Sequence, residues 1–234
     1  MIDHQVMLIT GTRKGIGLSL VKHFTEQGFY VVGCSRKPSD FSSDRYEHHT
    51  LDVRDESSVQ RLMGHIRSEL GSLRVLINNA GIAAMNHALL TPLSMVRDIL
   101  ETNVAATFVM CREAAKLLRL TSDARIVNLT SVAAPLNLEG EAIYAASKAA
   151  VETLTRVLSK ELAPLGITCN AVGPTPVKTD LIRNVPADKI ARLLGQQAIP
   201  RHGEPEDVAN VIDFFVKPQS DFVTGQVIYL GGVS

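Results

Sequence analysis

Tyr144 and Lys148 are the residues of this 234-residue sequence whose types and spacing most directly suggest chemistry. They lie four positions apart, so a helix would place them on one face, one turn apart. A free tyrosine hydroxyl titrates at about pH 10, and a nearby ammonium group lowers that pKa by favouring the phenolate. Tyr144 could then serve as a general acid or base. Ser131, at the end of an apolar run, could hold a carbonyl oxygen beside the tyrosine hydroxyl.

A glycine-rich segment near the start of the chain is the second chemical signal. Residues 10–17 read TGTRKGIG, between an apolar run at residues 6–10 and a helical pattern over residues 15–27. Glycines at this spacing allow a tight turn, a close approach of the backbone to a pyrophosphate, and close packing of helix on strand. The N–H groups and dipole of the helix N-terminus favour the negative charge of a phosphate. This strand–turn–helix context predicts a dinucleotide-binding site.

The residues after the second predicted strand indicate which dinucleotide would bind. An NAD-binding unit places an acidic residue about 20 positions after the glycines, where it holds the ribose hydroxyls. This sequence has Ser35, Arg36 and Lys37 there, and no carboxylate. Arg36 and Lys14 would offer two positive charges to a 2′-phosphate, and a guanidinium can bind phosphate in a bidentate manner. We therefore predict NADP(H), the alternative being that both residues are solvated surface charges.

Short apolar runs alternate with helical patterns along the whole chain, without repeats or low-complexity segments. This alternation predicts the α/β class, as a single doubly wound Rossmann domain over residues 1–234 with a seven-stranded parallel sheet flanked by helices on both faces. The predicted strands span residues 6–10, 29–34, 48–51, 73–78, 124–130, 167–171 and 226–230. The predicted helices span residues 15–27, 55–70, 92–120, 143–162 and 205–216.

Composition and charge argue against several classes of protein. The 24 basic and 24 acidic residues balance, which disfavours a nucleic-acid or polybasic membrane partner. Cys34, Cys111 and Cys169 are few and far apart, so we interpret them as reduced core residues of a cytoplasmic protein. We expect neither a signal peptide nor a membrane-spanning helix. The seven histidines show no HxxxH or HExxH pattern, so no metal site is expected either.

Together these motifs resemble those of the short-chain dehydrogenase/reductase family, over the whole chain. The resemblance rests on residues 10–17, the Asn78-Asn79-Ala80-Gly81 segment, Asn103, Ser131, Tyr144, Lys148 and the closing Thr224-Gly225-Gln226. It implies a catalytic set of Asn103, Ser131, Tyr144 and Lys148. In that set Asn103 kinks its helix and joins a water-linked proton path to Lys148.

The same resemblance implies roles in cofactor binding. Asp52 and Val53 would contact the adenine, Lys148 the nicotinamide ribose, and Val177 and Thr179 the nicotinamide amide. The full set of expected cofactor-binding residues is Gly11, Lys14, Gly15, Ile16, Gly17, Arg36, Asp52, Val53, Asn79, Ala80, Gly81, Tyr144, Lys148, Val177 and Thr179.

Within the family the sequence is most similar to 3-oxoacyl-carrier-protein reductases and related carbonyl reductases. That similarity implies reduction of a 3-oxoacyl thioester or a similar ketone. Two departures affect the substrate side. Pro174-Thr175-Pro176 replaces the family's usual Pro-Gly, which stiffens the loop. Ser122 and Leu165 stand where that subfamily often has arginines, which we expect around the mouth of the active site for an acidic carrier.

Residues 173–204 form a long segment with one short predicted helix near residues 187–195. Loops of this length are usually functional, and this one follows the carboxyl end of a strand, so we interpret it as a lid over the substrate rather than a surface insertion. Its apolar residues could contact an apolar substrate or seat the helix on its own domain: Leu181, Ile182, Val185, Ile190, Leu193 and Leu194. Its basic residues could dock a carrier or be solvated: Arg183, Lys189, Arg192 and Arg201.

Asn137, Glu139 and Glu141 leave a second substrate class open, because these side chains could equally bind the hydroxyls of a sugar or polyol or form a solvated turn. The leading hypothesis is thus an NADPH-dependent carbonyl reductase, and the rival enzyme is a sugar, polyol or small-alcohol dehydrogenase. A non-catalytic NADPH-sensing protein is an alternative from another class. Its discriminating feature would be a broken catalytic set, whereas the set is intact here.

Two helical patterns indicate self-association. The 143–162 helix is apolar almost all round, with its charges reduced mainly to Glu152, Arg156 and Lys160. The 92–120 helix is similar, with Met95, Ile99, Leu100, Phe108 and Leu118. A helix this apolar is buried on more than one side, so we predict a homodimer or homotetramer.

Overall fold

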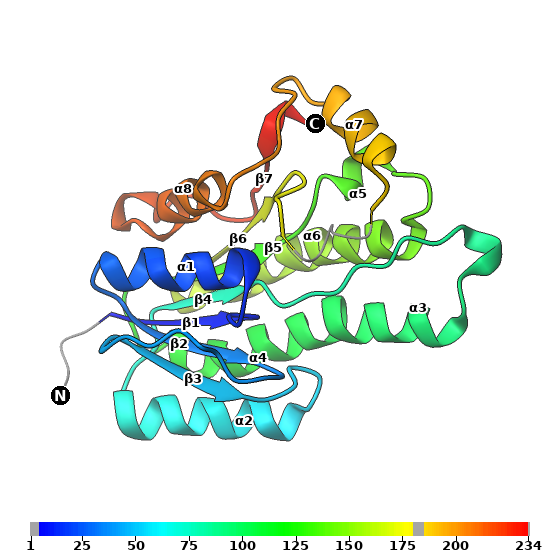
Figure 1. Ribbon diagram of the computed structural model, residues 1–234. Coiled ribbons are helices and arrows are strands. Elements are labelled where there is room, and N and C mark those ends of the chain that lie inside the picture. The colour runs from blue at the N-terminus through cyan, green and yellow to red at the C-terminus, as the bar shows by residue number, and fades with distance from the viewer. Residues whose placement is uncertain (1–4, 180–184, 234) are drawn as a thin grey trace.

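The computed structural model describes residues 5–179 and 185–233 (Figure 1). These residues form a seven-stranded sheet with the order β3-β2-β1-β4-β5-β6-β7, and all neighbouring strands are parallel. The strands are β1 (Val6–Thr10), β2 (Tyr30–Ser35), β3 (Tyr46–Thr50), β4 (Val75–Asn78), β5 (Ala124–Leu129), β6 (Ile167–Gly173) and β7 (Val227–Tyr229). The predicted doubly wound α/β fold is confirmed.

Helices cover both faces of this sheet (Figure 1). On one face, α1 (Gly15–Glu26) packs beside α8 (Pro205–Val216). On the other, α2 (Glu56–His65), α4 (Ala106–Leu118) and α6 (Ala142–Leu162) form the opposing layer. Because both faces are covered, the central strands read as continuous apolar runs rather than as alternating patterns.

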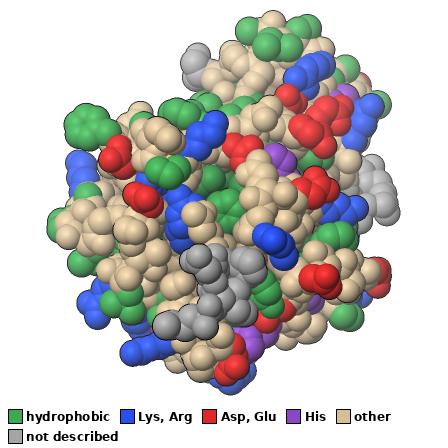
Figure 2. Space-filling model, turned by 90° about the vertical axis from the view of Figure 1, so that its left-hand side faces the viewer, with side chains coloured by type: hydrophobic (Ala, Val, Ile, Leu, Met, Phe, Trp, Pro, Cys, Tyr) green, Lys and Arg blue, Asp and Glu red, His purple; other side chains and the backbone are tan. Residues whose placement is uncertain are grey.

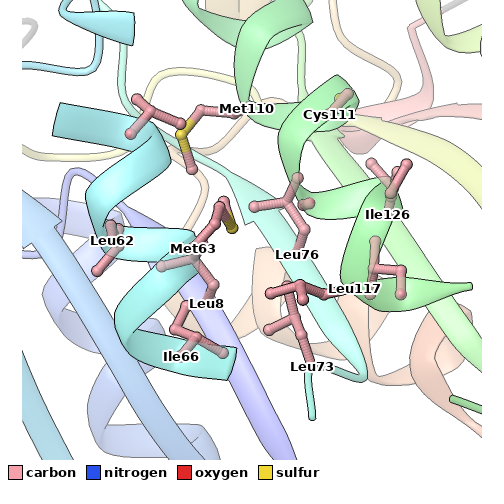
Figure 3. Packing of buried hydrophobic residues seen from close by; sticks show 14 of the residues in the cluster. Leu8, Leu62, Met63, Ile66, Leu73, Leu76, Met110, Cys111, Leu117 and Ile126 are labelled. Atoms are coloured by element: carbon pink, nitrogen blue, oxygen red, sulfur yellow. The ribbon is translucent and has the colours of Figure 1, made fainter. Parts of the chain in front are cut away.

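The core lies in two layers, one on each side of the sheet. Successive side chains of a strand point to opposite faces, so Leu8 packs toward α2 and α4 while Met7 and Ile9 pack toward α1 and α8. Figure 3 shows the first layer, where Leu76 and Ile126 from the sheet meet side chains of α2 and α4.

Several boundaries differ from the sequence prediction. The single helix predicted over residues 92–120 is divided into α3 (Leu93–Leu100), a π-helical turn (Glu101–Ala105) and α4. The helix predicted over residues 55–70 ends in a second π-helical turn (Ile66–Leu70), closed by Gly71 at a positive φ of 79°. A short helix, α5 (Ala133–Leu136), follows β5 and was not predicted. By contrast, α7 (Ala187–Gly195) lies where the sequence predicts it.

Three observations on the described residues relate to the expectations from composition and charge. Cys34, Cys111 and Cys169 are buried free thiols. No helix of residues 5–179 or 185–233 is long and apolar enough to cross a bilayer. Figure 2 shows the face at the amino ends of the strands, where basic and acidic side chains are interspersed and neither sign forms a continuous field.

The strand order places a topological switch point between β1 and β4. The chain leaves β1 for α1 on one face, and leaves β4 for α3 and α4 on the other. Ligands of open parallel sheets bind at such a point, beyond the carboxyl ends of the strands. The glycine-rich segment and the Asn79 segment both lie there.

The core packing predicts that Leu76→Ala lowers the free energy of unfolding by about 3 kcal/mol, because Leu76 is fully buried and its loss leaves a cavity. Leu120→Ala, at a side chain that is 66% exposed, is the control and should change stability by under about 0.5 kcal/mol. Urea unfolding of both variants is the measurement. A loss below about 1 kcal/mol for Leu76→Ala would contradict this packing.

Candidate active site

The glycine-rich segment folds as its composition requires. Gly11 and Gly15 have positive φ angles of 75° and 61°, a region that residues with a Cβ seldom adopt. A Cβ atom on Gly17 would lie 2.2 Å from the carbonyl oxygen of Gly11, so a glycine is needed for α1 to pass this close to the turn. The turn therefore presents backbone and the N-terminus of α1, the arrangement that accepts a pyrophosphate.

Asn79 and Thr10 hold this turn against the end of β4. The Thr10 hydroxyl oxygen accepts hydrogen bonds from the backbone N–H groups of Asn79 and Ala80 at 3.0 and 2.9 Å. In return the Asn79 side-chain amide donates to the carbonyl oxygens of Thr10 and Gly11 at 2.8 and 3.2 Å. The resemblance implied that residues 79–81 help to hold the central strands together. Four hydrogen bonds do join Asn79 and Ala80, after β4, to Thr10 and Gly11, at the end of β1.

A cavity of about 650 Å³ opens beside this turn at the carboxyl edge of the sheet. Its wall includes the predicted catalytic residues Ser131, Tyr144 and Lys148. From the predicted cofactor set it also includes Ile16, Asn79, Gly81, Val177 and Thr179. Thr179 lies over the glycine turn, because a Cβ on Gly15 would come 3.4 Å from its methyl group. The fold therefore brings the two chemical signals of the sequence to one cavity.

Ser131 and Tyr144 both lie in the wall of this cavity. Ser131 follows the carboxyl end of β5, and Tyr144 lies in the first turn of α6 and is 8% exposed. Burial raises the pKa of Tyr144 to about 12, the hydrogen bond from Ser131 lowers it, and the charge of Glu141 raises it. Tyr144 is therefore protonated at neutral pH.

Lys148 lies one turn further along α6, but its ammonium is not the dominant influence on Tyr144. Its Nζ donates to the carbonyl oxygen of Leu129 at 2.8 Å and lies 5.8 Å from the centre of the Tyr144 ring. Burial lowers the pKa of Lys148 to about 8. The expectation that Lys148 lowers the pKa of Tyr144 is not met in this arrangement, because burial of the hydroxyl is the largest influence on that pKa.

Asn103 lies in the π-helical turn between α3 and α4, which agrees with the helix distortion that the resemblance implied. Its side chain exchanges two hydrogen bonds of 2.9 Å with the backbone of Ile82 and donates a third, of 3.0 Å, to the hydroxyl of Ser147. A Cβ on Gly81 would lie 3.2 Å from Asn103 Oδ1 and 3.5 Å from Lys148 Nζ. Gly81 thus lies between Asn103 and Lys148, the two residues that the expected water-linked proton path would join.

The predicted adenosine-binding residues lie at the carboxyl ends of β2 and β3. Arg36 is exposed directly after β2. Asp52 is held by Arg54 at 2.7 Å, and these hydrogen bonds lower the pKa of Asp52, with the charge of Arg36 acting in the same direction. Val53 is buried beside them, and Lys14 is the residue immediately before α1.

A polar network that the sequence analysis missed connects the glycine turn to this region. The Tyr46 hydroxyl lies 3.0 Å from Thr12 Oγ1 and 2.8 Å from Nδ1 of His48. The other ring nitrogen of His48 lies 3.1 Å from both the Ser35 hydroxyl and the Lys37 carbonyl oxygen. These contacts hold the chain on either side of Arg36. The alternation of side chains along β3 was the available signal, since it places Tyr46 and His48 on one face.

The structure places several charged or substituted positions that the sequence analysis discussed. Ser122 and Leu165 lie two residues before β5 and β6, so within this chain they are at the amino edge of the sheet, opposite the cavity. Arg201 is paired with Asp207 at 2.6 Å at the start of α8. Glu152, expected in a charged stripe, is buried and accepts a hydrogen bond from Thr130 at 2.8 Å.

The lid segment supplies much of the cavity wall. Its described residues Val185, Lys189, Ile190, Arg192 and Leu193 line the cavity, whereas Leu181, Ile182 and Arg183 lie outside the described residues. A backbone bridge between Val177 and Gly203 brings the two ends of the segment together.

Polar residues also line the cavity. Among them are Asn137, Glu139 and Glu141. Burial raises the pKa of Glu141, while the charge of Lys189 lowers it. The cavity therefore joins an apolar stretch to a partly buried carboxyl group.

A glycine turn built for a pyrophosphate, opening on a Ser131–Tyr144 pair with Lys148 alongside, defines a nicotinamide-dependent oxidoreductase that acts on CH–OH or carbonyl groups. The family described as "Enoyl-(Acyl carrier protein) reductase" matches residues 11–233. The chain belongs to the short-chain dehydrogenase/reductase family.

Three relatives illustrate the likeness. A 3-oxoacyl-[acyl-carrier-protein] reductase FabG from Vibrio cholerae is 28% identical over 237 residues, covering 99% of this chain and 97% of that protein. The ligand-free structure of an aldohexose dehydrogenase, AldT, from Thermoplasma acidophilum has a TM-score of 0.89 at 28% identity, covering 98% of this chain and 94% of that chain. The structure of ElxO with NADP bound also has a TM-score of 0.89, at 29% identity and 97% of each chain.

The buried Lys148 predicts a pH dependence of stability. Its folded-state pKa of about 8 is below its usual 10.5, so between these values the unfolded chain binds more protons and stability rises with pH. The destabilisation that comes from burying the charged form of Lys148 is fully present below about pH 8. Between about pH 7.5 and 9.5, the wild type should gain about 1–2 kcal/mol relative to Lys148→Met, measured by urea unfolding. Parallel pH profiles for the two proteins would show that Lys148 is not desolvated.

Proposed function

We propose that this protein is an NADPH-dependent reductase that converts a ketone to a secondary alcohol, with a 3-oxoacyl thioester as the leading substrate. The observation that carries the proposal is that Ser131, Tyr144 and Lys148 all line the wall of one 650 Å³ cavity beside the glycine turn. The likeness to the FabG reductase of Vibrio cholerae supports the thioester.

The side chains divide the work of such a reduction. A reduced nicotinamide, when bound, supplies the hydride that adds to the carbonyl carbon. The Ser131 hydroxyl would hold the carbonyl oxygen by a hydrogen bond. Tyr144, which is protonated at neutral pH, would donate its proton to that oxygen. The ketone thereby gains a hydride at carbon and a proton at oxygen, which gives the alcohol.

Lys148 and Asn103 would support this proton transfer. A Lys148 ammonium near the tyrosine ring stabilises the phenolate that is left when the proton departs. Asn103 is fixed by its three hydrogen bonds close to Lys148, across Gly81, where a water could join the two polar groups. The resemblance assigns the nicotinamide ribose to Lys148 and the amide to Val177 and Thr179, and both of the latter line the cavity.

NADPH is the proposed form of the cofactor. Arg36 is exposed at the end of β2, the neighbouring positions 35 and 37 carry no carboxylate, and Lys14 begins the turn into α1. The network of Tyr46 and His48 holds the backbone on both sides of Arg36. The NADP bound in the structurally similar ElxO supports this assignment.

A sugar or polyol dehydrogenase is the second candidate. Asn137, Glu139 and Glu141 line the cavity, and side chains of these types bind hydroxyl groups. The similarity to the aldohexose dehydrogenase AldT favours the same class. Under either candidate, residues 173–204 act as the lid of a single NADP(H)-binding domain, and Lys189 and Arg192 are the described lid cations at the cavity.

We also propose a homodimer or homotetramer. Large apolar side chains are exposed on the helices of the sheet's α4 and α6 face, namely Leu93, Leu100, Phe108 and Val157. Since α3 and α4 both contact α6, these side chains belong to one helical layer. Symmetric pairing through this layer would remove them from water. A cytoplasmic location remains a prediction.

The test of function compares wild type with Tyr144→Phe on a panel of 3-oxoacyl thioesters, simple ketones and aldohexoses, followed by nicotinamide absorbance. Loss of the proton donor should lower turnover by about a thousandfold while NADPH binding, followed by fluorescence, is retained. Tyr30→Phe, on β2, is the matched control and should keep full activity. Retention of most of the rate by Tyr144→Phe would contradict the mechanism, and activity on aldohexoses alone would replace the leading substrate with the second candidate.

Arg36→Ala tests the cofactor preference. Loss of a guanidinium that binds the 2′-phosphate should weaken NADPH at least about tenfold more than NADH, because NADH lacks that phosphate. Titration of both dinucleotides by fluorescence is the measurement, with Arg119→Ala at the end of α4 as the control. Equal losses for NADPH and NADH would show that Arg36 does not contact the 2′-phosphate.

A further inference from the structure

Glu47, His49 and His65 form a cluster on the edge of the sheet that the proposed reaction does not use. Glu47 and His49 are two positions apart on β3 and so point to the same face, and His65 is the last residue of α2, which covers that face. Nε2 of His49 and Nε2 of His65 lie 3.2 and 3.0 Å from the same carboxylate oxygen, Oε1 of Glu47. Three side chains from two elements thus converge on one point.

A further contact fixes the orientation of the carboxylate. The Tyr30 hydroxyl on β2 donates a hydrogen bond of 3.3 Å to Glu47 Oε2, which leaves Oε1 directed at the two imidazoles. The rings of His49 and His65 are 4.7 Å apart and tilted by 59°.

The donor atoms match the requirements of a transition-metal ion. Two imidazole nitrogens and one carboxylate oxygen are ligands typical of Zn²⁺, and the three atoms lie within 4.8 Å of one another. With metal–ligand bonds of about 2.0–2.1 Å, the ligand atoms of a tetrahedral site lie roughly 3.3 Å apart. The two Glu47–histidine distances, 3.2 and 3.0 Å, are close to that value, and the two histidine nitrogens lie within 4.8 Å of each other.

The surroundings allow an ion to enter and remain bound. The three side chains are 25–34% exposed, so one side of the cluster is open to water while the other is covered by β3 and α2. A water molecule could complete the coordination on the open side. Imidazole ligands favour Zn²⁺, Co²⁺, Ni²⁺ or Cu²⁺ over Mg²⁺ and Ca²⁺, which prefer oxygen ligands.

We propose that Glu47, His49 and His65 bind a divalent transition-metal ion, with Zn²⁺ as the representative, at a site separate from the catalytic cavity. The expectation from sequence spacing was that the histidines bind no metal. His49 and His65 are 16 residues apart in the sequence, but the packing of α2 on β3 brings both side chains to the carboxylate of Glu47. The ion would link the edge strand of the sheet to its covering helix.

Calorimetric titration of the full-length, tag-free protein with ZnCl₂ tests the proposal, with MgCl₂ as the comparison ion. We expect one equivalent of Zn²⁺ to bind and Mg²⁺ to give no signal. His49→Ala, His65→Ala and Glu47→Gln should each weaken Zn²⁺ at least about tenfold, since loss of even an outer-shell partner typically costs 10–100-fold. His87→Ala, at an exposed histidine outside the cluster, should bind as the wild type does.

A thermal measurement distinguishes loss of the site from loss of the fold. At about 100 times its dissociation constant for wild type, Zn²⁺ should raise the Tm of wild type and His87→Ala by several degrees, and that of His65→Ala by about half as much or less. Circular dichroism without metal checks folding, and His65→Gln replaces His65→Ala if the latter is unfolded. Zn²⁺ binding that is equal in wild type and in all three cluster variants, or absent from wild type, would overturn the proposal.

Discussion

The hydrogen bonds between Thr10 and the Asn79 segment are the interaction on which the rest of the site depends. They fasten the turn after β1 to the end of β4, at the point where the chain changes from one face of the sheet to the other. Gly17 then lets α1 pass close over that turn, and Gly81 brings the next loop beside Asn103 and Lys148. The glycine turn and the residues on α6 come from separate parts of the chain. They share a cavity because these backbone contacts fix the loops between them.

Desolvation, rather than attraction between neighbouring charges, sets the protonation of the central residues. Tyr144 and Lys148 are both buried, and burial disfavours whichever form is charged. The tyrosine consequently keeps its proton and the lysine releases its own more easily. This state keeps the proton on Tyr144, but the raised pKa makes its hydroxyl a weaker acid than that of a free tyrosine. It also means that a ligand or a water entering the cavity, by changing the local polarity, can change both groups together.

Local patterns sufficed to predict much of this molecule, whereas contacts between distant segments did not. The apolar run of β1, the helix at 205–216 and the i, i+4 spacing of Tyr144 and Lys148 follow from neighbouring residues, and the structure has them as predicted. The Tyr46–His48 network and the Glu47 cluster depend on the register of β3 and on the packing of α2, which no local pattern encodes. The pKa of Tyr144 was misjudged because burial is a property of the assembled fold.

The two outer strands of the sheet bear on how the protein behaves at high concentration. An exposed strand edge with unpaired backbone groups can recruit another chain and seed aggregation. At one side β3 carries mainly polar side chains, including Glu47, His48 and His49, and at the other β7 is three residues long. A short strand and a polar strand are both poor templates for adding a further strand. Neither edge of the described sheet therefore favours the addition of a strand from another copy of the chain.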